Sequence, residues 1–295
     1  MSSDRQLAGV GFGLLAYGIW GFFPLFFRQL SQLSPMDVLS NRAVWAFVLV
    51  GLLLTLRRQW PMVAAVFGNG RHLAMLAVAA LLIGSNWLVF LWAVANQQVM
   101  ASSLGYFLTP LVNVLLGLLV LKERLNRLEW FSVALALLAI ANEVVALGSL
   151  PWVSLVLATT FGTYGLVRKQ LPVDAISSLW LETLAMLPAC GLYALWQAQH
   201  AHAVFSGHDL RTTLLLISAG AITALPLMAF AAATQRLKLV TVGMLMYINP
   251  TLQLLTAVWV FGEPMSSARL LSFALIWLGL LVFSYSAWGK YRRRT

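Results

Sequence analysis

Residues 110–123 read PLVNVLLGLLVLKE, and residues 250–263 read PTLQLLTAVWVFGE. The two segments lie 140 positions apart and share a proline, an amide and a closing glutamate: Pro110/Pro250, Asn113/Gln253 and Glu123/Glu263. Hydrophobic identities arise easily by chance in apolar sequence, whereas aligned prolines and glutamates do not. The pair of segments therefore indicates that the second half of the chain repeats the first.

The composition is that of a membrane protein. Of the 295 residues, 61% are hydrophobic and 9% are charged, whereas a soluble domain carries about 25% charged residues to wet its surface. A spanning helix needs roughly 20 apolar residues to cross a hydrocarbon core of ~30 Å. Runs of that length predict an all-α integral membrane protein with ten transmembrane helices: 7–27, 38–56, 73–95, 100–121, 129–147, 149–167, 175–196, 211–233, 239–261 and 268–288.

The positions of Lys and Arg predict the orientation. With a cytoplasmic N-terminus, fifteen of the nineteen lie in inside segments, three lie outside (Arg28, Arg211 and Arg269) and Arg42 lies within a helix. This positive-inside bias requires an even number of spans and places both termini in the cytoplasm. We therefore expect a multi-pass protein of a bacterial inner membrane. The net charge of +10 then reflects topology, not nucleic-acid binding, and the basic tail at 290–294 is expected to contact anionic lipids.

Five helices per repeat is an odd number, so the second repeat enters the membrane from the opposite side. We expect two inverted five-helix repeats, residues 1–147 and 148–295, related by a pseudo-two-fold axis in the membrane plane and surrounding a central cavity. This architecture recurs in secondary transporters, where the substrate binds near mid-membrane between the repeats. A duplicated structural protein without a transport pathway is the alternative.

Only two charged residues are predicted well inside the apolar runs, Arg42 and Glu182, and they also align at the 140-residue shift. A charge at the bilayer centre costs about 2.5–3.5 kcal/mol and marks function by default. Arg42 is expected to attract an anionic group of the substrate, and Glu182 to bind a proton or a substrate amine. Alternatively, each is paired locally or extends to its nearest interface.

Other polar and aromatic residues gather at similar depth. Pro226 and the paired prolines free backbone carbonyls one turn earlier, which is tolerated at depth only against protein or a water-filled cavity. Each tryptophan predicted at this depth could equally serve only to pack the helices together. The side chains expected to contact the substrate, besides Arg42 and Glu182, are Tyr17, Trp20, Asn86, Trp87, Tyr106, Asn113, Tyr164, Tyr247 and Gln253.

The sequence offers no enzyme signature, since it has no His-Glu-x-x-His pair, Gly-x-Ser-x-Gly elbow or Walker loop. We expect neither a catalytic site nor a cofactor. His200, His202 and His208 share one loop, but without closed tetrahedral spacing they are a weak signal for metal, and no metal site is predicted. Glu123 and Glu263 close their segments, and we expect each to face a helix N-terminus or to pair with a neighbouring cation.

Several strings resemble the RarD-type permeases, in the EamA branch of the drug/metabolite transporter superfamily. They are Ile19-Trp20-Gly21, Asn86-Trp87-Leu88, Ser103-Leu-Gly-Tyr106-Phe107, Pro110-Leu-Val-Asn113, Tyr164-Gly-Leu-Val-Arg168-Lys169 and Phe261-Gly-Glu263. The resemblance covers nearly the whole chain. It implies two inverted EamA-type repeats with cytoplasmic termini, a cavity lined by both halves, and export or exchange of small metabolites by alternating access. RarD-type proteins carry a chloramphenicol-sensitivity label, which does not establish a substrate.

Together these features favour a secondary transporter that exports a small amphipathic metabolite or amino-acid-like compound by alternating access. Proton coupling through Glu182 is a further hypothesis. The expected partners are the small-molecule substrate, membrane lipids and protons; monomer and homodimer both remain open. The alternative class is a non-transporting membrane sensor or assembly partner, whose polar interior only holds the helices together.

Overall fold

The computed structural model describes residues 3–120, 125–200, 204–205, 207, 209–234, 236–237 and 245–292. All regular structure in these residues is helical. The elements are α1 (Ser3–Gly21), α2 (Phe23–Arg28), α3 (Pro35–Leu56), α4 (Trp60–Phe67), α5 (Gly70–Ala95), α6 (Val99–Val120), α7 (Arg127–Leu147), α8 (Trp152–Lys169), α9 (Ala175–Ala198), α10 (Leu210–Thr234), α12 (Ile248–Leu255), the π-helical η1 (Thr256–Val260) and α13 (Ser267–Arg292).

Within the described residues, eight segments are long and apolar enough to cross a membrane. One of them, Leu7–Arg28, runs through α1 and α2, and the others lie in α3, α5, α6, α7, α9, α10 and α13. The chain is therefore a multi-pass membrane protein. The shorter α8 and the α12–η1 pair lie where two further spans were predicted but are not among the eight, so the number ten stays a prediction.

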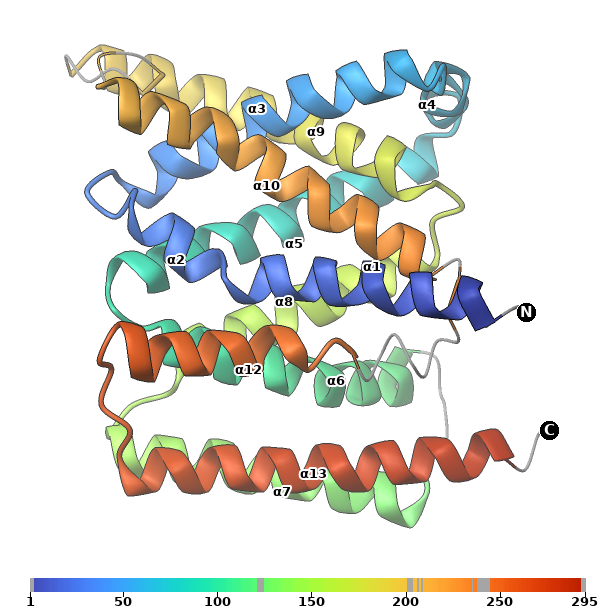
Figure 1. Ribbon diagram of the computed structural model, residues 1–295, viewed down its shortest axis with the longest axis vertical. Coiled ribbons are helices and arrows are strands. Elements are labelled where there is room, and N and C mark those ends of the chain that lie inside the picture. The colour runs from blue at the N-terminus through green and yellow to red at the C-terminus, as the bar shows by residue number, and fades with distance from the viewer. Residues whose placement is uncertain are drawn as a thin grey trace.

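The long helices lie roughly side by side, and both chain termini emerge at the same end of the bundle (Figure 1). We call this the terminal end. The opposite end, the far end, carries the turn between α5 and α6, the link between α7 and α8, and the start of α13 (Figure 1).

The most extensive helix packings join the two halves of the chain. α7 packs against α13, α6 against α8, and α10 against both α1 and α3. α5 packs on α8 and α9, and α12 packs on α1 and α6. The core therefore lies between the halves, and neither half could be removed without exposing the other.

Local sequence accounts for the helix boundaries that matter here. Asn126 and Glu129 form a reciprocal capping box, each side chain accepting from the other residue's backbone N–H, so α7 begins at Arg127. Gly148 ends the same helix with a φ of 65°, a left-handed conformation that favours glycine. Ser34 caps α3 by accepting from the backbone N–H of Asp37 at 3.1 Å.

The contact between α3 and α10 depends on one glycine. A Cβ atom built at Gly220 would lie 2.5 Å from the carbonyl carbon of Trp45 and 2.7 Å from the backbone nitrogen of Ala46. Both atoms belong to a helix backbone, which cannot move aside like the end of a side chain. The two helices thus approach closely only because position 220 has no side chain.

Gly220→Ala is therefore expected to lower the free energy of unfolding by about 1–3 kcal/mol, the usual cost of overpacking. Gly191→Ala in α9 is the matched control, because nothing lies within 4 Å of a Cβ atom there, and it should be neutral or stabilising by up to about 1 kcal/mol. Denaturant titration of both purified variants measures the difference. Equal stability of the two variants would contradict the close approach.

Candidate functional site

Arg42 lies on α3 and is 2% exposed, surrounded by aromatic rings and a single polar partner. Its guanidinium carbon sits 4.0 Å from the ring centroid of Trp87 and 5.1 Å and 5.4 Å from those of Phe27 and Phe23. Its Nε donates to Oγ1 of Thr223 on α10 at 2.7 Å, whereas its Nη1 is buried and has no hydrogen-bond partner. Ring faces attract the cation, but a donor is left unused.

Asn86 lies one position before Trp87 and joins three helices. Its Nδ2 donates to the backbone oxygen of Leu157 at 3.0 Å and to Oγ1 of Thr160 at 2.9 Å, both on α8. Its Oδ1 accepts from the hydroxyl of Tyr106 on α6 at 3.0 Å. All the polar groups of the Asn86 amide are therefore engaged within the protein.

Glu182 is 1% exposed on α9 and has two partners on α8. The hydroxyl of Tyr164 donates to its Oε2 at 3.1 Å, and Nε of Arg168 lies 3.8 Å from its Oε1. This loose ion pair corresponds to local pairing, one of the two interpretations the sequence left open. Oε1 nevertheless lacks a hydrogen-bond partner.

Arg42 and Glu182 are not bonded to each other, but a row of aromatic rings connects them. Phe90 contacts Phe23 and Phe27 beneath Arg42, at centroid distances of 6.4 Å and 6.2 Å, and Tyr106 at 6.3 Å. Tyr106 meets Phe161 at 5.9 Å, and Phe161 meets Tyr164, the partner of Glu182, at 6.1 Å. We call the rings between the two charges (Phe90, Tyr106, Phe161 and Tyr164) the aromatic row.

The remaining predicted contact residues form smaller groups. The ring centroids of Tyr17 and Trp20 lie 5.5 Å apart on α1, and both rings contact Phe230 of α10. Gln253 is buried between Asn249, to which it donates at 2.9 Å, and Ser102, from which it accepts at 3.1 Å.

Asn113 and Tyr247 complete the predicted set. Asn113 is exposed on α6, and its Oδ1 would lie 3.2 Å from a Cβ atom at Gly162. Tyr247 is partly buried at the start of α12.

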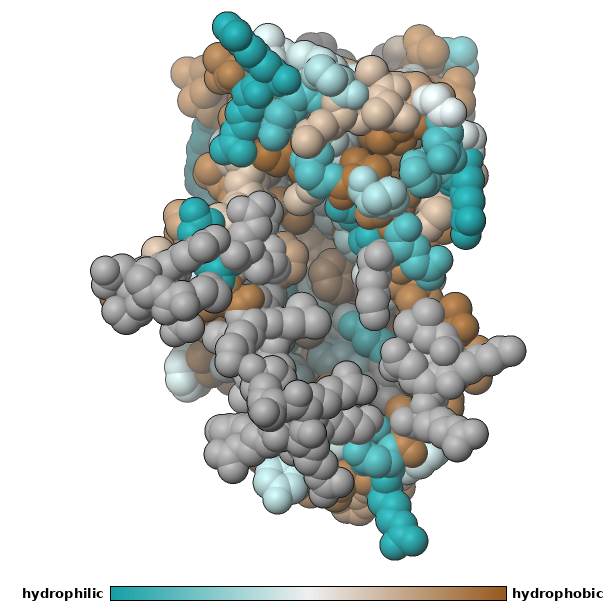
Figure 2. All heavy atoms as spheres, turned by 90° about the vertical axis from the view of Figure 1, so that its right-hand side faces the viewer, coloured by the Kyte–Doolittle hydropathy of each residue, from teal (hydrophilic) through white to brown (hydrophobic). Residues whose placement is uncertain are grey.

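The face at the terminal end is hollowed near its middle, with hydrophilic and hydrophobic residues in its depth (Figure 2).

Sequence reasoning missed Glu143. It lies in α7, four residues before that helix ends and inside the span predicted at 129–147, but only Arg42 and Glu182 were expected as charges within the spans. The side chain is 1% exposed, so Arg42 and Glu182 are not the only charges buried in a predicted span. The sequence did contain a signal for this buried charge, because Asn142 and Glu143 are two adjacent polar residues within an apolar run.

For Glu263, the prediction that it faces a helix N-terminus is confirmed. Its Oε1 and Oε2 accept from the backbone N–H groups of Val99 and Met100, at 2.7 Å and 2.8 Å, where α6 begins. Burial raises the pKa of this carboxyl, and the two N–H groups oppose that rise. Its repeat partner Glu123 lies outside the described residues. Of the three histidines in the loop after α9, His202 and His208 also lie outside them. His200 is exposed and contacts the backbone oxygen of Trp196.

The sequence model of the EamA-like transporter family matches residues 7–142 and again residues 150–285. The chain belongs to that family. An uncharacterized transporter of Vibrio cholerae is 44% identical over 96% of this chain and 95% of its own length. Protein RarD of Escherichia coli is 38% identical over 99% of each chain. The resemblance to RarD-type permeases is thereby confirmed.

The fold of this EamA-family protein is also similar to a solved crystal structure, with a TM-score of 0.60 over 96% of this chain and 98% of the other. At 19% sequence identity this likeness concerns the fold alone. The Vibrio cholerae relative is named a transporter, and the family that matches both parts of the chain is described as EamA-like transporters.

Asn86→Leu is expected to lower the free energy of unfolding by about 1–3 kcal/mol, because the Tyr106 hydroxyl loses its acceptor and α8 loses two bonds. Tyr106→Phe removes only one of the three bonds and serves as the control, with a loss of about 1 kcal/mol or less. Denaturant titration in detergent measures both. A smaller loss for Asn86→Leu than for Tyr106→Phe would contradict the central position of Asn86.

Proposed function

We propose that this EamA-family protein is a secondary transporter that exports a small amphipathic, amino-acid-like compound by alternating access. The observation that carries the proposal is the buried guanidinium of Arg42, whose Nη1 has no partner. A buried charge is costly unless it is paired and hydrogen-bonded. A carboxylate on the substrate would supply the missing acceptor.

The aromatic row supports an amphipathic cargo. Between Arg42 and Glu182, Phe90, Tyr106 and Phe161 offer ring surface. The polar atoms without a hydrogen-bond partner lie at the two ends, on the Arg42 guanidinium and the Glu182 carboxylate. Small-molecule sites combine an apolar lining with a few placed polar groups that fix orientation. An anionic group at Arg42 with an apolar body along the rings fits this pattern. The full proposed contact set is Tyr17, Trp20, Arg42, Asn86, Trp87, Tyr106, Asn113, Tyr164, Glu182, Tyr247 and Gln253.

We also propose that residues 1–147 and 148–295 are inverted five-helix repeats, giving ten spans with α8 and α12–η1 included. Two features support this. The family model matches the chain twice. The helix packings also occur in repeat-related pairs: α1 on α10 with α8 on α5, α6 on α8 with α12 on α1, and α3 on α10 with α9 on α5. When two inverted repeats exchange conformations, the protein passes between two states related by the pseudo-two-fold axis, one open to each side of the membrane, which is the basis of alternating access.

The proposed location is a bacterial inner membrane with both termini in the cytoplasm. The two termini emerge at one end of the bundle (Figure 1), and Arg57, Arg58 and Arg71 lie around α4, among the segments expected to be cytoplasmic. The excess of basic residues on this side follows the positive-inside rule.

Arg42→Gln is expected to reduce substrate flux at least tenfold, because a hydrogen bond to a charged group contributes about 1.5–3 kcal/mol. Arg42→Lys keeps the charge without the planar fork and should retain part of the activity. Flux is measured in proteoliposomes, with each member of a metabolite library tested as a candidate substrate. Wild-type flux in Arg42→Gln would make this arginine structural, and no flux of any compound through the wild type would favour the non-transporting sensor.

Proton coupling through Glu182 is proposed on its burial and its loose pairing, 3.8 Å from Arg168. Glu182→Gln keeps the shape of the side chain but cannot release a proton. The same proteoliposomes, with and without a pH gradient, should show that the gradient accelerates wild-type flux and has no effect on the variant. An unchanged response of Glu182→Gln to the gradient would remove the coupling role.

A further inference from the structure

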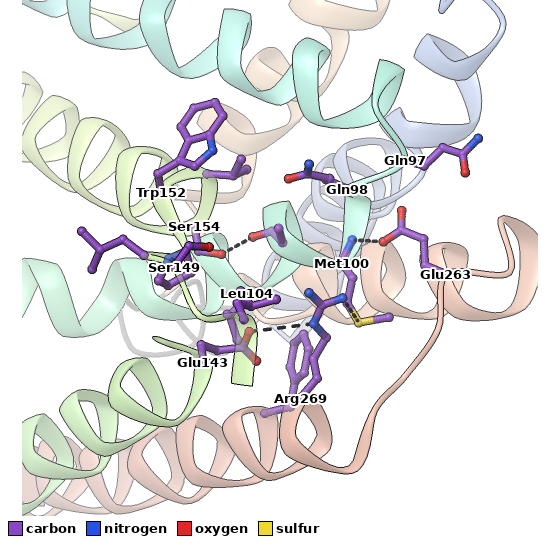
Figure 3. A pocket seen from close by; sticks show the side chains of 16 residues that line it. Gln97, Gln98, Met100, Leu104, Glu143, Ser149, Trp152, Ser154, Glu263 and Arg269 are labelled. Atoms are coloured by element: carbon purple, nitrogen blue, oxygen red, sulfur yellow. Dashed lines mark hydrogen bonds and ion pairs between the residues drawn. The ribbon is translucent and has the colours of Figure 1, made fainter. Parts of the chain in front are cut away.

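A pocket lies at the far end of the bundle, away from the proposed contact residues. It has a volume of about 320 Å³ and lies where α6, α8 and α13 begin and α7 ends (Figure 3). None of the residues proposed to contact the transported substrate lines it. Such a volume is at the lower end of the range for small-molecule sites and fits a molecule of amino-acid size.

Glu143 supplies this pocket with a buried, incompletely paired carboxylate. Its Oε2 lies 3.9 Å from Nε of Arg269, and its Oε1 is buried with no hydrogen-bond partner. In Figure 3 the carboxylate points from α7 toward Arg269. A buried acceptor left without a donor costs about 1–3 kcal/mol, and more when charged, so a donor entering the pocket would relieve that cost.

Arg269 supplies unused donors beside it. The side chain is 23% exposed, its Nε faces Glu143, and its Nη1 contacts the sulfur of Met100 at 3.6 Å. Thioether sulfur is a weak acceptor, and a guanidinium has five N–H donors. Arg269 can therefore receive an anionic group while it stays beside Glu143.

The other acid in the pocket is already satisfied. Glu263 accepts two backbone N–H bonds at the start of α6, and the helix N-terminus favours its negative charge. The unpaired group is thus one buried acceptor at Glu143. It lies beside the partly exposed Arg269 in a pocket whose lining includes the exposed apolar side chains of Leu150 and Trp152.

We propose that this pocket binds a small soluble zwitterion, with its protonated amine on Glu143, its carboxylate on Arg269 and its side chain against Trp152. The site is separate from the one around Arg42 and does not depend on transport. By its position at the far end, it would hold an amino-acid-like molecule on the membrane side opposite the termini.

The test uses leucine, 3-methylbutylamine and 4-methylpentanoate, which carry both charged groups, only the amine and only the carboxylate. Calorimetric titration of the full-length protein in nanodiscs of phosphatidylglycerol measures their binding. Leucine is expected to bind most tightly. Glu143→Gln should weaken leucine binding about tenfold or more, the equivalent of a charge-assisted hydrogen bond. Gly191→Ala, at a position that lines neither this pocket nor the proposed transport site, should leave it unchanged.

A labelling experiment places the ligand in this pocket. The only cysteine, Cys190, is buried, so Ser149→Cys at the exposed pocket wall introduces the readily accessible thiol. Leucine should slow its reaction with a maleimide, and adding Glu143→Gln should abolish that protection.

Three results would overturn the inference: equal binding of 4-methylpentanoate and leucine, wild-type leucine affinity in Glu143→Gln, or loss of binding in Arg42→Gln alone. The last would assign the ligand to the Arg42 site and leave the proposed transport intact. Occupancy by a lipid headgroup would appear as protection of Ser149→Cys by phosphatidylethanolamine nanodiscs without leucine, and would equally exclude a soluble ligand. Conversely, an absence of flux would refute the proposed function without affecting these binding results.

Discussion

Hydrocarbon supplies no hydrogen bonds, so a polar side chain kept within a membrane must find its partner on the protein itself. Here the partners belong mainly to the other half of the chain. Ser103 donates to the backbone oxygen of Pro250, and Ser154 to that of Ala101, each at 2.7 Å. Asn86 donates in the same way to Leu157. These bonds fix the two halves against each other where apolar packing alone would have little directional preference.

Against this background, the incomplete pairings stand out. Arg42 has one bond and an unused donor, and Glu143 has one loose ion pair and an unused acceptor. A buried charge in this condition lowers stability. We interpret both as binding groups because the missing partner in each case is a simple one: an anion for Arg42, an ammonium group for Glu143.

The sequence was sufficient for the features that depend on composition and periodicity. It predicted the eight apolar spans found in the described residues and the burial of Arg42 and Glu182. For Glu263 it offered a helix N-terminus as one of two alternatives, and this is the one that the structure shows. It could not predict that Arg168 would pair with Glu182, because that contact depends on how α8 and α9 pack. The aromatic row is equally invisible in sequence, since its rings come from α5, α6 and α8.

The two bonds at Glu263 have a mechanical consequence. The carboxylate of Glu263, in the link that leads into α13, accepts hydrogen bonds from the first two backbone N–H groups of α6. The bonds share one acceptor group, so separating these segments would break both together, against about 1.5–3 kcal/mol for each. A small displacement that would lengthen only one bond is therefore opposed by both. The start of α6 and the link into α13 therefore stay joined through both bonds or separate completely.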